Sequence, residues 1–188
     1  MPVQVHRHVG RVPMPWANGG GITYEVARWP EGTADFDWRL SVAEVATEGP
    51  FSSYPGVDRT LVLLSGGMRL VIDDLAHELV PGSPIAFTGD SRVSAELTDG
   101  PTMDFNVMSR QGAVSATVEV VTGPEVQLDP AGGGWWAAFV LDGSWMSLDQ
   151  QLGVWDCVIG DEPFTITGSG SVVRIGLTLD GPRAETQL

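Results

Sequence analysis

The sequence predicts an all-β protein, a sandwich or barrel of short antiparallel strands, and three observations support this prediction. Apolar and polar residues alternate with a period of two along most of the 188-residue chain, as in strands that bury one face. The 24 glycines and 13 prolines are spread along the chain, and many of them separate the alternating segments as turn residues do. No segment sustains a helical period for long, so regularly spaced turns between short strands are the better description.

The alternation is clearest in residues 36–42, where Phe36, Trp38 and Leu40 share one face and Arg39 and Ser41 share the other. Further strands are expected at residues 22–29, 60–64, 68–73, 85–88, 93–98, 103–109, 115–121, 136–141, 155–159, 164–167 and 172–179. Among the turns that separate them are residues 142–143 and 168–170, which are rich in glycine. The sequence also allows one short helix, at residues 147–152 or near the start of the second half.

The composition changes near residue 110. Residues 1–110 carry eight arginines, 14 acidic residues and all three histidines, whereas residues 111–188 carry two arginines and ten acidic residues. Each part contains roughly six expected strands. We therefore expect two β-barrels in one chain: residues 1–110 would carry the functional site, and residues 111–188 would form a second, smaller barrel packed against the first.

The charge of the chain restricts its partners. The formal net charge is −14, and all ten basic residues are arginine, so a lysine Schiff base and a Walker phosphate loop are excluded. Nucleic acid and anionic membrane surfaces would be repelled, and we expect neither as a partner. The chain has no apolar signal core, no apolar run long enough to span a membrane and a single cysteine, Cys157, which together predict a cytoplasmic protein without a disulfide.

The segment Pro15-Trp16-Ala17-Asn18-Gly19-Gly20-Gly21 is the most unusual in the chain. Three consecutive glycines cost backbone entropy, so the local geometry must require them. Two explanations remain open at this point. The glycine amides could hold a bound small molecule, with Trp16 covering a planar part of it, or the glycines could simply form the tight turn that leads into a barrel.

Two arginines are the strongest candidates for binding an anion. Arg59 follows Asp58 in a loop that leads into an apolar strand, and neighbours along a strand point to opposite faces. The planar guanidinium group suits a carboxylate ligand, although a structural ion pair or a clamp onto loop carbonyls would explain it at least as well. Arg39 interrupts an apolar strand on the same face as Ser41, and that face could line a barrel interior or meet solvent.

Metal and catalytic signals are weak. His6 and His8 are spaced to share one strand face, but no third ligand follows at a suitable distance, so no metal site is expected. Carboxylates such as Glu25 and Asp104 could form an acid–base pair only if folding brought them together. Asp104 and Asn106 share one face of an expected strand, which would be either a polar pocket wall or an exposed surface.

Several motifs, taken in order, resemble the HutD/Ves family. They are Pro15-Trp16-x-Asn18-Gly19-Gly20-Gly21-x-Thr23-x-Glu25, Phe36-Asp37-Trp38-Arg39-Leu40-Ser41, Gly49-Pro50-Phe51-Ser52, Pro55-Gly56-Val57-Asp58-Arg59-Thr60-Leu61 and Asp104-Phe105-Asn106-Val107-Met108. The resemblance is specific over about residues 5–110 and looser beyond them. It implies a bicupin, with two jelly-roll β-barrels in one chain. The positions at which cupins usually bind a metal carry no histidine here, so the resemblance implies neither a metal nor another cofactor.

The family is linked to histidine utilisation, and the resemblance implies a modulator of the pathway that binds a small carboxylate such as urocanate or N-formylglutamate. Arg39 or Arg59 would bind the carboxylate, and Trp16 would cover an apolar part of the ligand. Relatives often carry a basic residue where this chain has Ala17, so one anion contact is missing. The implied ligand site comprises Trp16, Asn18, Gly19, Gly20, Gly21, Thr23, Glu25, Arg39, Ser41, Asp58, Arg59 and Asn106, with the glycine amides and Asn18 binding the remaining ligand oxygens.

Two alternatives belong to other functional classes. A metal-independent isomerase or hydrolase would use a carboxylate pair such as Glu25 and Asp104. An interaction module would instead dock its acidic surface onto a partner protein. A cupin-like barrel often pairs through an edge strand, so a homodimer is plausible in either case.

Overall fold

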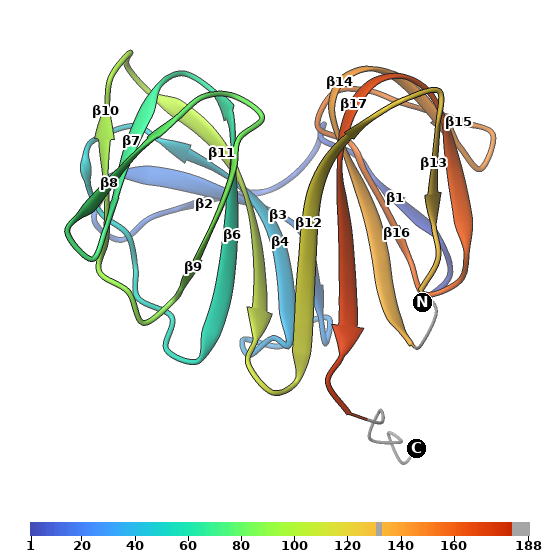
Figure 1. Ribbon diagram of the computed structural model, residues 1–188, viewed down its shortest axis with the longest axis horizontal. Helices are drawn as coiled ribbons and strands as arrows, with labels where there is room; N and C mark the ends of the chain where they lie inside the picture. Colours follow the sequence, from blue (N-terminus) through green and yellow to red (C-terminus); the bar gives the residue numbers. More distant parts are fainter. Residues whose placement is uncertain (131–132, 182–188) are drawn as a thin grey trace.

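Over the residues that the computed structural model describes, 1–130 and 133–181, the chain forms strands and no helix. The all-β prediction is confirmed. Figure 1 shows the strands in two groups that lie side by side, one mainly from the blue-to-green part of the chain and one mainly from the yellow-to-red part. Within the described residues, no helix is long and apolar enough to cross a membrane.

The first group is a barrel made of a six-stranded and a four-stranded sheet, whose facing surfaces enclose an apolar cluster that includes Leu61, Leu63, Met68 and Leu70. In spatial order, the six-stranded sheet contains β2 (Pro13–Pro15), β3 (Gly21–Trp29), β4 (Trp38–Val45), β11 (Thr102–Arg110), β6 (Val57–Ser65) and β9 (Pro84–Thr88). The four-stranded sheet contains β5 (Gly49–Pro50), β10 (Val93–Leu97), β7 (Met68–Ile72) and β8 (Leu75–Leu79).

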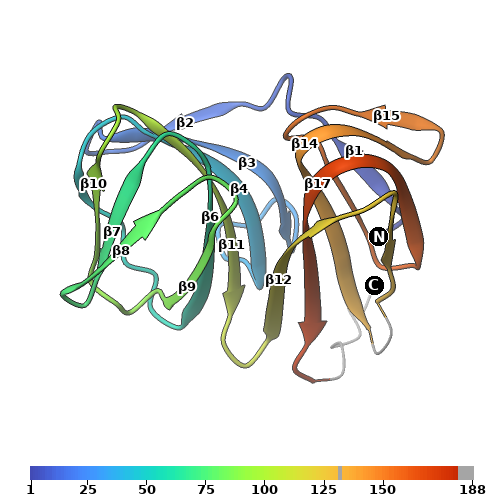
Figure 2. The same cartoon turned by 45° about the horizontal axis from the view of Figure 1, so that its top comes forward.

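The second group is a seven-stranded sheet that curls around a separate apolar cluster including Trp145, Leu152 and Ile166. Its strands are β1 (Gln4–His6), β16 (Cys157–Gly160), β14 (Gly134–Ser147), β17 (Phe164–Leu179), β12 (Val114–Thr122), β13 (Glu125–Leu128) and β15 (Gln150–Leu152). The strand β1 departs from the expected division of the chain at residue 110, because it pairs with β16 rather than with the first group. The chain then crosses between the groups to reach β2 (Figure 2).

Two segments that the sequence analysis assigned to turns lie inside long strands. Residues 142–143 belong to β14 and residues 168–170 belong to β17, and Gly143 is paired with Gly170. A Cβ atom on Gly143 would overlap the carbonyl oxygen of Ser169, so glycine is needed here for close approach of two backbones. The register shifts between Val140 and Asp142, where the paired strands bend.

The short helix allowed at residues 147–152 is also absent from the structure, and that expectation was wrong. Leu148 and Asp149 adopt positive φ angles of 50° and 58°. Two successive left-handed residues make a tight hairpin turn between antiparallel strands, and here they connect β14 to β15.

The central strands β4 and β11 of the six-stranded sheet are buried on both faces. One face lines the interior of the first barrel, and the other packs against the second group through Trp38, Leu40 and Phe105. Phe105 stacks on Phe139 of β14 with ring centroids 4.1 Å apart. Alternation along β4 and β11 therefore sends every second side chain into the first barrel, and these inward-facing side chains include polar ones.

Candidate functional site

Strand pairing brings a set of mostly polar side chains from the first half onto one wall of the barrel. The strands β3, β4, β11 and β6 are antiparallel neighbours, and directly paired residues point to the same face of the sheet. The inward-facing rows are Thr23, Ala43 and Asp104; Glu25, Ser41 and Asn106; and Arg39, Met108 and Arg59. Residues far apart in the sequence thus meet on one surface.

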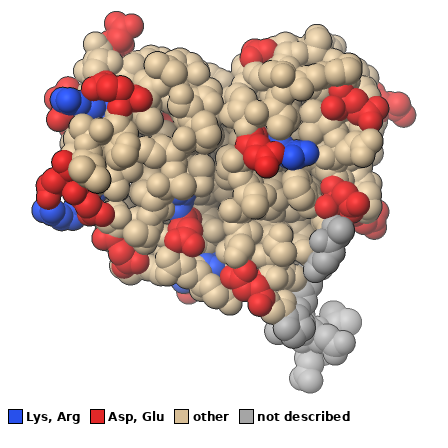
Figure 3. Space-filling model, in the orientation of Figure 1, with Lys and Arg blue, Asp and Glu red and all other residues tan. Residues whose placement is uncertain are grey.

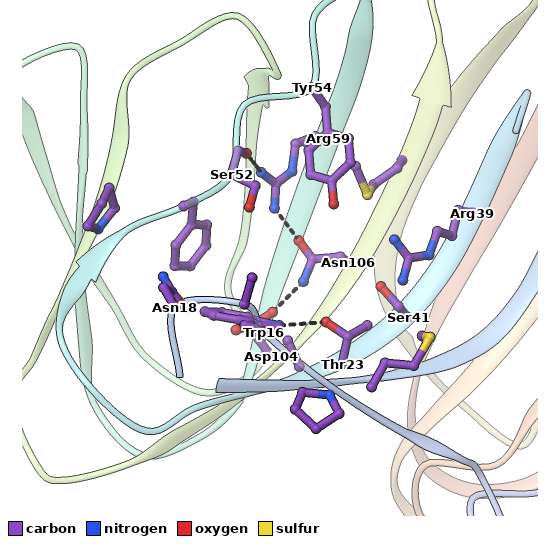
Figure 4. A pocket seen from close by; sticks show the side chains of 17 residues that line it. Trp16, Asn18, Thr23, Arg39, Ser41, Ser52, Tyr54, Arg59, Asp104 and Asn106 are labelled. Carbon is purple, nitrogen blue, oxygen red and sulfur yellow. Dashed lines mark hydrogen bonds between the residues drawn. The ribbon is translucent and has the colours of Figure 1, made fainter. Parts of the chain in front are cut away.

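This wall forms the floor of a cavity of about 360 Å³, which the close-up in Figure 4 shows. Residues 14–18, 50–52 and 54 provide the rest of its lining, so Trp16 and Tyr54 stand beside the polar floor. Arg39 and Arg59 approach the space in front of Asn106 and Ser41 from two sides in this view. The cavity thus combines aromatic walls with a charged floor.

Arg59 is a buried cation, with 7% of its surface exposed. One guanidinium nitrogen, Nη2, donates to Oδ1 of Asn106 at 3.0 Å, and Nη1 donates to the Ser52 carbonyl at 3.3 Å. Its Nε finds no hydrogen-bond partner among the described residues. The guanidinium carbon lies 5.0–5.6 Å from the ring centroids of Phe51, Tyr54 and Phe87.

Burial lowers the pKa of Arg59, whereas the nearby Asp104 raises it. A guanidinium remains protonated in proteins, so Arg59 brings a positive charge into the barrel. The aromatic rings and two hydrogen bonds only partly replace its hydration. An anion in the cavity would compensate this charge further.

Asp104 is completely buried on the cavity wall. Its Oδ1 accepts a hydrogen bond from Nδ2 of Asn106, while the described residues offer no partner to its Oδ2. Burial raises the pKa of Asp104 to about 7. The positive charge of Arg59 and the hydrogen bond from Asn106 stabilise the ionised carboxylate and so lower the pKa, but they do not cancel the rise. The carboxyl group can therefore gain or lose its proton near neutral pH.

Arg39 is held in place by Glu25. Nε of Arg39 donates to Oε2 of Glu25 at 3.1 Å, and Nε of Arg28 donates to the same oxygen at 2.8 Å. The carboxylate of Glu25 thus serves two arginines and does not line the cavity, although Glu25 lies on the same face of the sheet as Ser41. Glu25 and Asp104 do not form an acid–base pair across the cavity, because Glu25 is occupied by these ion pairs.

The glycine triplet shapes the loop at the cavity mouth. The Gly19 amide donates to the Trp16 carbonyl at 3.0 Å, and the Gly20 amide donates to Oδ1 of Asn18 at 2.9 Å. A Cβ atom on Gly21 would overlap the Glu44 carbonyl and lie 3.1 Å from the Trp16 ring. The amides of Gly19 and Gly20 are thus used within the loop, and the explanation by tight turn geometry fits them better than ligand contact.

Trp16 is fixed over the cavity by two contacts. Its indole Nε1 donates to Oγ1 of Thr23 at 2.8 Å, and its ring meets the Phe51 ring edge-on at 6.2 Å. The absence of a side chain at Gly21 leaves room for the indole. The loop therefore presents one oriented aromatic surface to the cavity.

The structure brings together seven of the twelve residues expected in the ligand site. These residues line the cavity: Trp16, Asn18, Thr23, Arg39, Ser41, Arg59 and Asn106. Five others are not on its wall: Gly19, Gly20, Gly21, Glu25 and Asp58. Asp58 is exposed on the opposite face of β6 from Arg59 and accepts a hydrogen bond from Nε2 of Gln111 at 2.7 Å.

The sequence analysis did not place Phe51, Ser52, Tyr54 or Asp104 in the ligand site, although all four line the cavity. The first three lie in the motif block before Arg59, so their position in that block was the available signal. Asp104 was considered as an acid–base residue and, with Asn106, as part of either a polar pocket wall or an exposed surface, but it was not named as a ligand-site residue. Among residues 1–130 and 133–181, no three histidine, cysteine, aspartate or glutamate side chains are grouped to bind a metal ion.

Fold and cavity together define a class: an all-β, jelly-roll protein with a cavity of polar floor and aromatic walls in its first barrel. Comparison with known proteins specifies the family. The HutD family profile matches residues 10–173, and the chain belongs to the HutD family. Membership fits an association with histidine utilisation.

Individual relatives agree with this assignment. Protein Ves of Citrobacter koseri is 38% identical over 140 residues, which is 73% of this chain and 72% of that protein. The structure of HutD from Pseudomonas fluorescens SBW25 is 34% identical, with a TM-score of 0.86 over 95% of this chain and 100% of that one. A conserved protein of unknown function from Pseudomonas aeruginosa PAO1 is 28% identical, with a TM-score of 0.82 over 96% of this chain and 100% of that one.

Proposed function

We propose that this protein binds a small carboxylate in the cavity of its first barrel and modulates histidine utilisation through binding, without catalysing a reaction. N-formylglutamate and urocanate are the proposed ligands. The observation that carries the proposal is Arg59, a buried guanidinium on the cavity wall whose charge no described carboxylate contacts directly.

A carboxylate ligand would suit the cavity in charge, shape and size. It would supply Arg59 with an anionic partner at a buried position, where charge-assisted hydrogen bonds are strong. Arg39, fixed by Glu25, would donate to a second oxygen of the ligand. A volume of about 360 Å³ is near the lower end of the range for small-molecule sites, about 300–1,000 Å³.

The arrangement favours binding over catalysis. The carboxylate pair on which the enzyme hypothesis depended is not assembled at the cavity, because Glu25 is engaged with Arg28 and Arg39. The described residues provide no grouped metal ligands that could activate water. What the wall does offer is a positive charge, neutral hydrogen-bonding groups and the aromatic surfaces of Trp16 and Tyr54, which suit recognition.

Thermal shift and calorimetric titration with N-formylglutamate, urocanate, histidine and glutamate test the proposal. A ligand that binds the native state raises the free energy of unfolding by about 2.7 kcal/mol at a hundredfold excess over Kd, and Tm rises as a consequence. We expect a shift with at least one of these acids and its loss in Arg59→Gln. Arg59→Lys would retain part of it, because a lysine keeps the charge but not the planar geometry.

Arg69→Gln is the matched control, because Arg69 is a half-exposed arginine of the same barrel that pairs with Glu78 and Glu96 outside the cavity. This variant should bind as the unmodified protein does. No shift with any of the four acids would contradict the proposal. The acidic surface in Figure 3, where red side chains are scattered over both halves, would then direct attention to a protein partner.

A further inference from the structure

We infer that the cavity selects dicarboxylates, with Arg59 binding one carboxylate of the ligand and Arg39 binding the other, so that Arg39 determines specificity. This inference rests on the proposed function, because it concerns the same cavity. It narrows the ligand from any small carboxylate to one that carries two. Three features support it: a row of arginines on the cavity wall, the sharing of Glu25, and the separate anchoring of the two guanidinium groups.

Three arginines stand in one row across the wall of the first barrel. The register pairs Arg28 of β3 with Arg39 of β4, and it pairs Met108 of β11 with both Arg39 and Arg59. Directly paired residues point to the same face, so the three guanidinium groups start from one face of the sheet. Like charges on directly paired residues are destabilising, and this row therefore favours anions beside it.

Glu25 is the one carboxylate among the described residues that forms an ion pair with this row, and Arg28 takes the larger part of it. Arg28 directs both Nε and Nη2 to Oε2 of Glu25, with the Nε contact at 2.8 Å. Arg39 reaches the same oxygen with Nε alone, at 3.1 Å. The three arginines and Glu25 together thus keep a surplus of positive charge.

Asp104 does not take the place of a second anion at this row. It precedes Met108 by four residues on β11, which is about 13 Å along an extended strand. Its hydrogen bond goes to Asn106, and its charge acts on Arg59 across that amide. One ionised carboxyl group cannot cancel the surplus of the row, so an anionic ligand is favoured whichever form Asp104 takes.

Arg39 keeps its terminal donors for a ligand. Its Nη1 and Nη2 have no hydrogen-bond partner among the described residues, and both retain accessible surface, in contrast to Nε of Arg59. The side chain lines the cavity, and Figure 4 shows its guanidinium group beside Ser41. These two nitrogens form the outer edge of a planar fork, so they can bind one carboxylate through two parallel hydrogen bonds.

The two guanidinium groups that line the cavity are held at separate places. Nε of Arg39 is bonded to Glu25 on β3, and Nη2 of Arg59 is bonded to Asn106 on β11. Glu25 and Asn106 are both paired with Ser41, so their α-carbons lie two strand spacings apart, about 10 Å. A ligand with a carboxylate at each end can use both groups, whereas a monocarboxylate leaves one of them without an anion.

Calorimetric titration with three ligands of nearly equal size tests the inference. N-formylglutamate carries two carboxylates, and N-formylglutamine and N-formylisoglutamine each replace one of them with an uncharged amide. Measurements at pH 7.5 keep every ligand carboxylate ionised. We expect N-formylglutamate to bind about five- to twentyfold more tightly than the better of the two amides, because hydrogen bonds between charged groups are stronger than those to neutral ones.

Arg39→Gln should remove this preference, because it replaces the second guanidinium group with a neutral amide. The Kd values of N-formylglutamate and of the better amide should then agree within about threefold. Arg59→Gln should instead weaken binding of all three ligands. Arg69→Gln, which removes a half-exposed arginine outside the cavity, should keep both the affinity and the preference of the unmodified protein.

Arg28→Gln gives a readout that loss of a cavity contact cannot explain, because Arg28 does not line the cavity. In this variant Glu25 has only Arg39 as its partner, so less positive charge is left for a ligand. We expect the preference for N-formylglutamate to fall by about threefold while the amides bind as before. An unchanged preference would contradict selection by the surplus charge of the row.

The outcomes separate this inference from the proposed function. If neither these ligands nor urocanate, histidine or glutamate binds, the proposed function fails, and this inference fails with it. If an amide or urocanate, each with one carboxylate, binds as tightly as N-formylglutamate, the carboxylate site stands and the selection of dicarboxylates is overturned. A preference that persists in Arg39→Gln overturns the role of Arg39. The comparison of ligands uses the unmodified protein, so it decides even if that variant does not fold.

Discussion

Arg59 is connected to Asp104 through the side-chain amide of Asn106, which accepts from the arginine and donates to the carboxyl group. All three side chains are buried, and they lie on the adjacent strands β6 and β11. Each bond fixes the direction of the other, because reversing the amide would place donor against donor. The chain of three residues thus sets the geometry of the cavity floor before any ligand arrives.

Asn106→Ala should destabilise the protein by about 2–4 kcal/mol, because it leaves hydrogen-bonding groups of Arg59 and Asp104 buried without their partner. Urea denaturation followed by tryptophan fluorescence measures this change. Gln127→Ala, which removes an exposed amide bonded to Glu125, should change stability by less than about 0.5 kcal/mol. Equal changes in the free energy of unfolding for the two substitutions would mean that the hydrogen bonds linking Arg59, Asn106 and Asp104 contribute nothing to stability.

Stability should depend on pH through Asp104. Its pKa is raised from 3.8 to about 7 in the folded state, so between these values the folded protein binds more protons than the unfolded chain. The free energy of unfolding contributed by this group therefore falls as pH rises from about 4 to 7, by at most about 4 kcal/mol.

Asp104→Asn should remove this dependence, so the variant gains stability relative to the unmodified protein as pH rises from 4 to 8. Urea titrations at several pH values measure the difference. Asp58→Asn is the control, because it neutralises an exposed carboxylate and should leave the slope unchanged. A constant difference between Asp104→Asn and the unmodified protein across this range would show that Asp104 is not titrating there.

Gly21→Ala should destabilise the protein by about 1–3 kcal/mol, since the added methyl group overlaps the Glu44 carbonyl and crowds the Trp16 ring. A changed tryptophan emission spectrum should accompany the loss. The comparison is Gly153→Ala, where the nearest atom to a new Cβ is 3.8 Å away. If Gly21→Ala were as mild as Gly153→Ala, the loop would have room that the structure does not indicate.

Thr23→Val should weaken binding of N-formylglutamate by about three- to tenfold, because Trp16 loses the hydroxyl that orients its indole. The fold should change little, since valine has nearly the same shape. Calorimetric titration gives the ratio of Kd values, and Thr165→Val, at an exposed position of β17, serves as the control. Unchanged affinity in Thr23→Val would mean that the orientation of Trp16 does not affect the ligand.

Much of the fold follows from local sequence patterns. The alternation around Trp38 and Arg39 indicates a strand directly, and it also states which side chains share a face. When both faces of a strand are buried, the alternation cannot show what each face contacts. For this reason the sequence left open whether Arg39 lines a barrel interior or meets solvent. Only the packing of the second group against Trp38 shows that the face of Arg39 turns into the first barrel.

The cavity was harder to predict, because it depends on long-range pairing. Asp104 and Asn106 were expected on one strand face, but nothing local indicates that Arg59 lies on the neighbouring strand opposite Met108, close enough to bond Asn106. Glycine signals in the second half were misleading for the same reason. Gly143 and Gly170 are required by the closeness of two backbones, a relation between strands that a single segment cannot express.

The sheet that carries the cavity floor has apolar side chains on its reverse side, where Phe105 stacks on Phe139. The central strands of this sheet therefore have two sets of contacts: one face lines the first barrel, and the other packs against the neighbouring half. A shift of β11 that repositions Asn106 must also displace Phe105, the residue next to it. The second half, whose described residues contribute no side chain to the cavity lining, is then the support that holds the cavity floor in place.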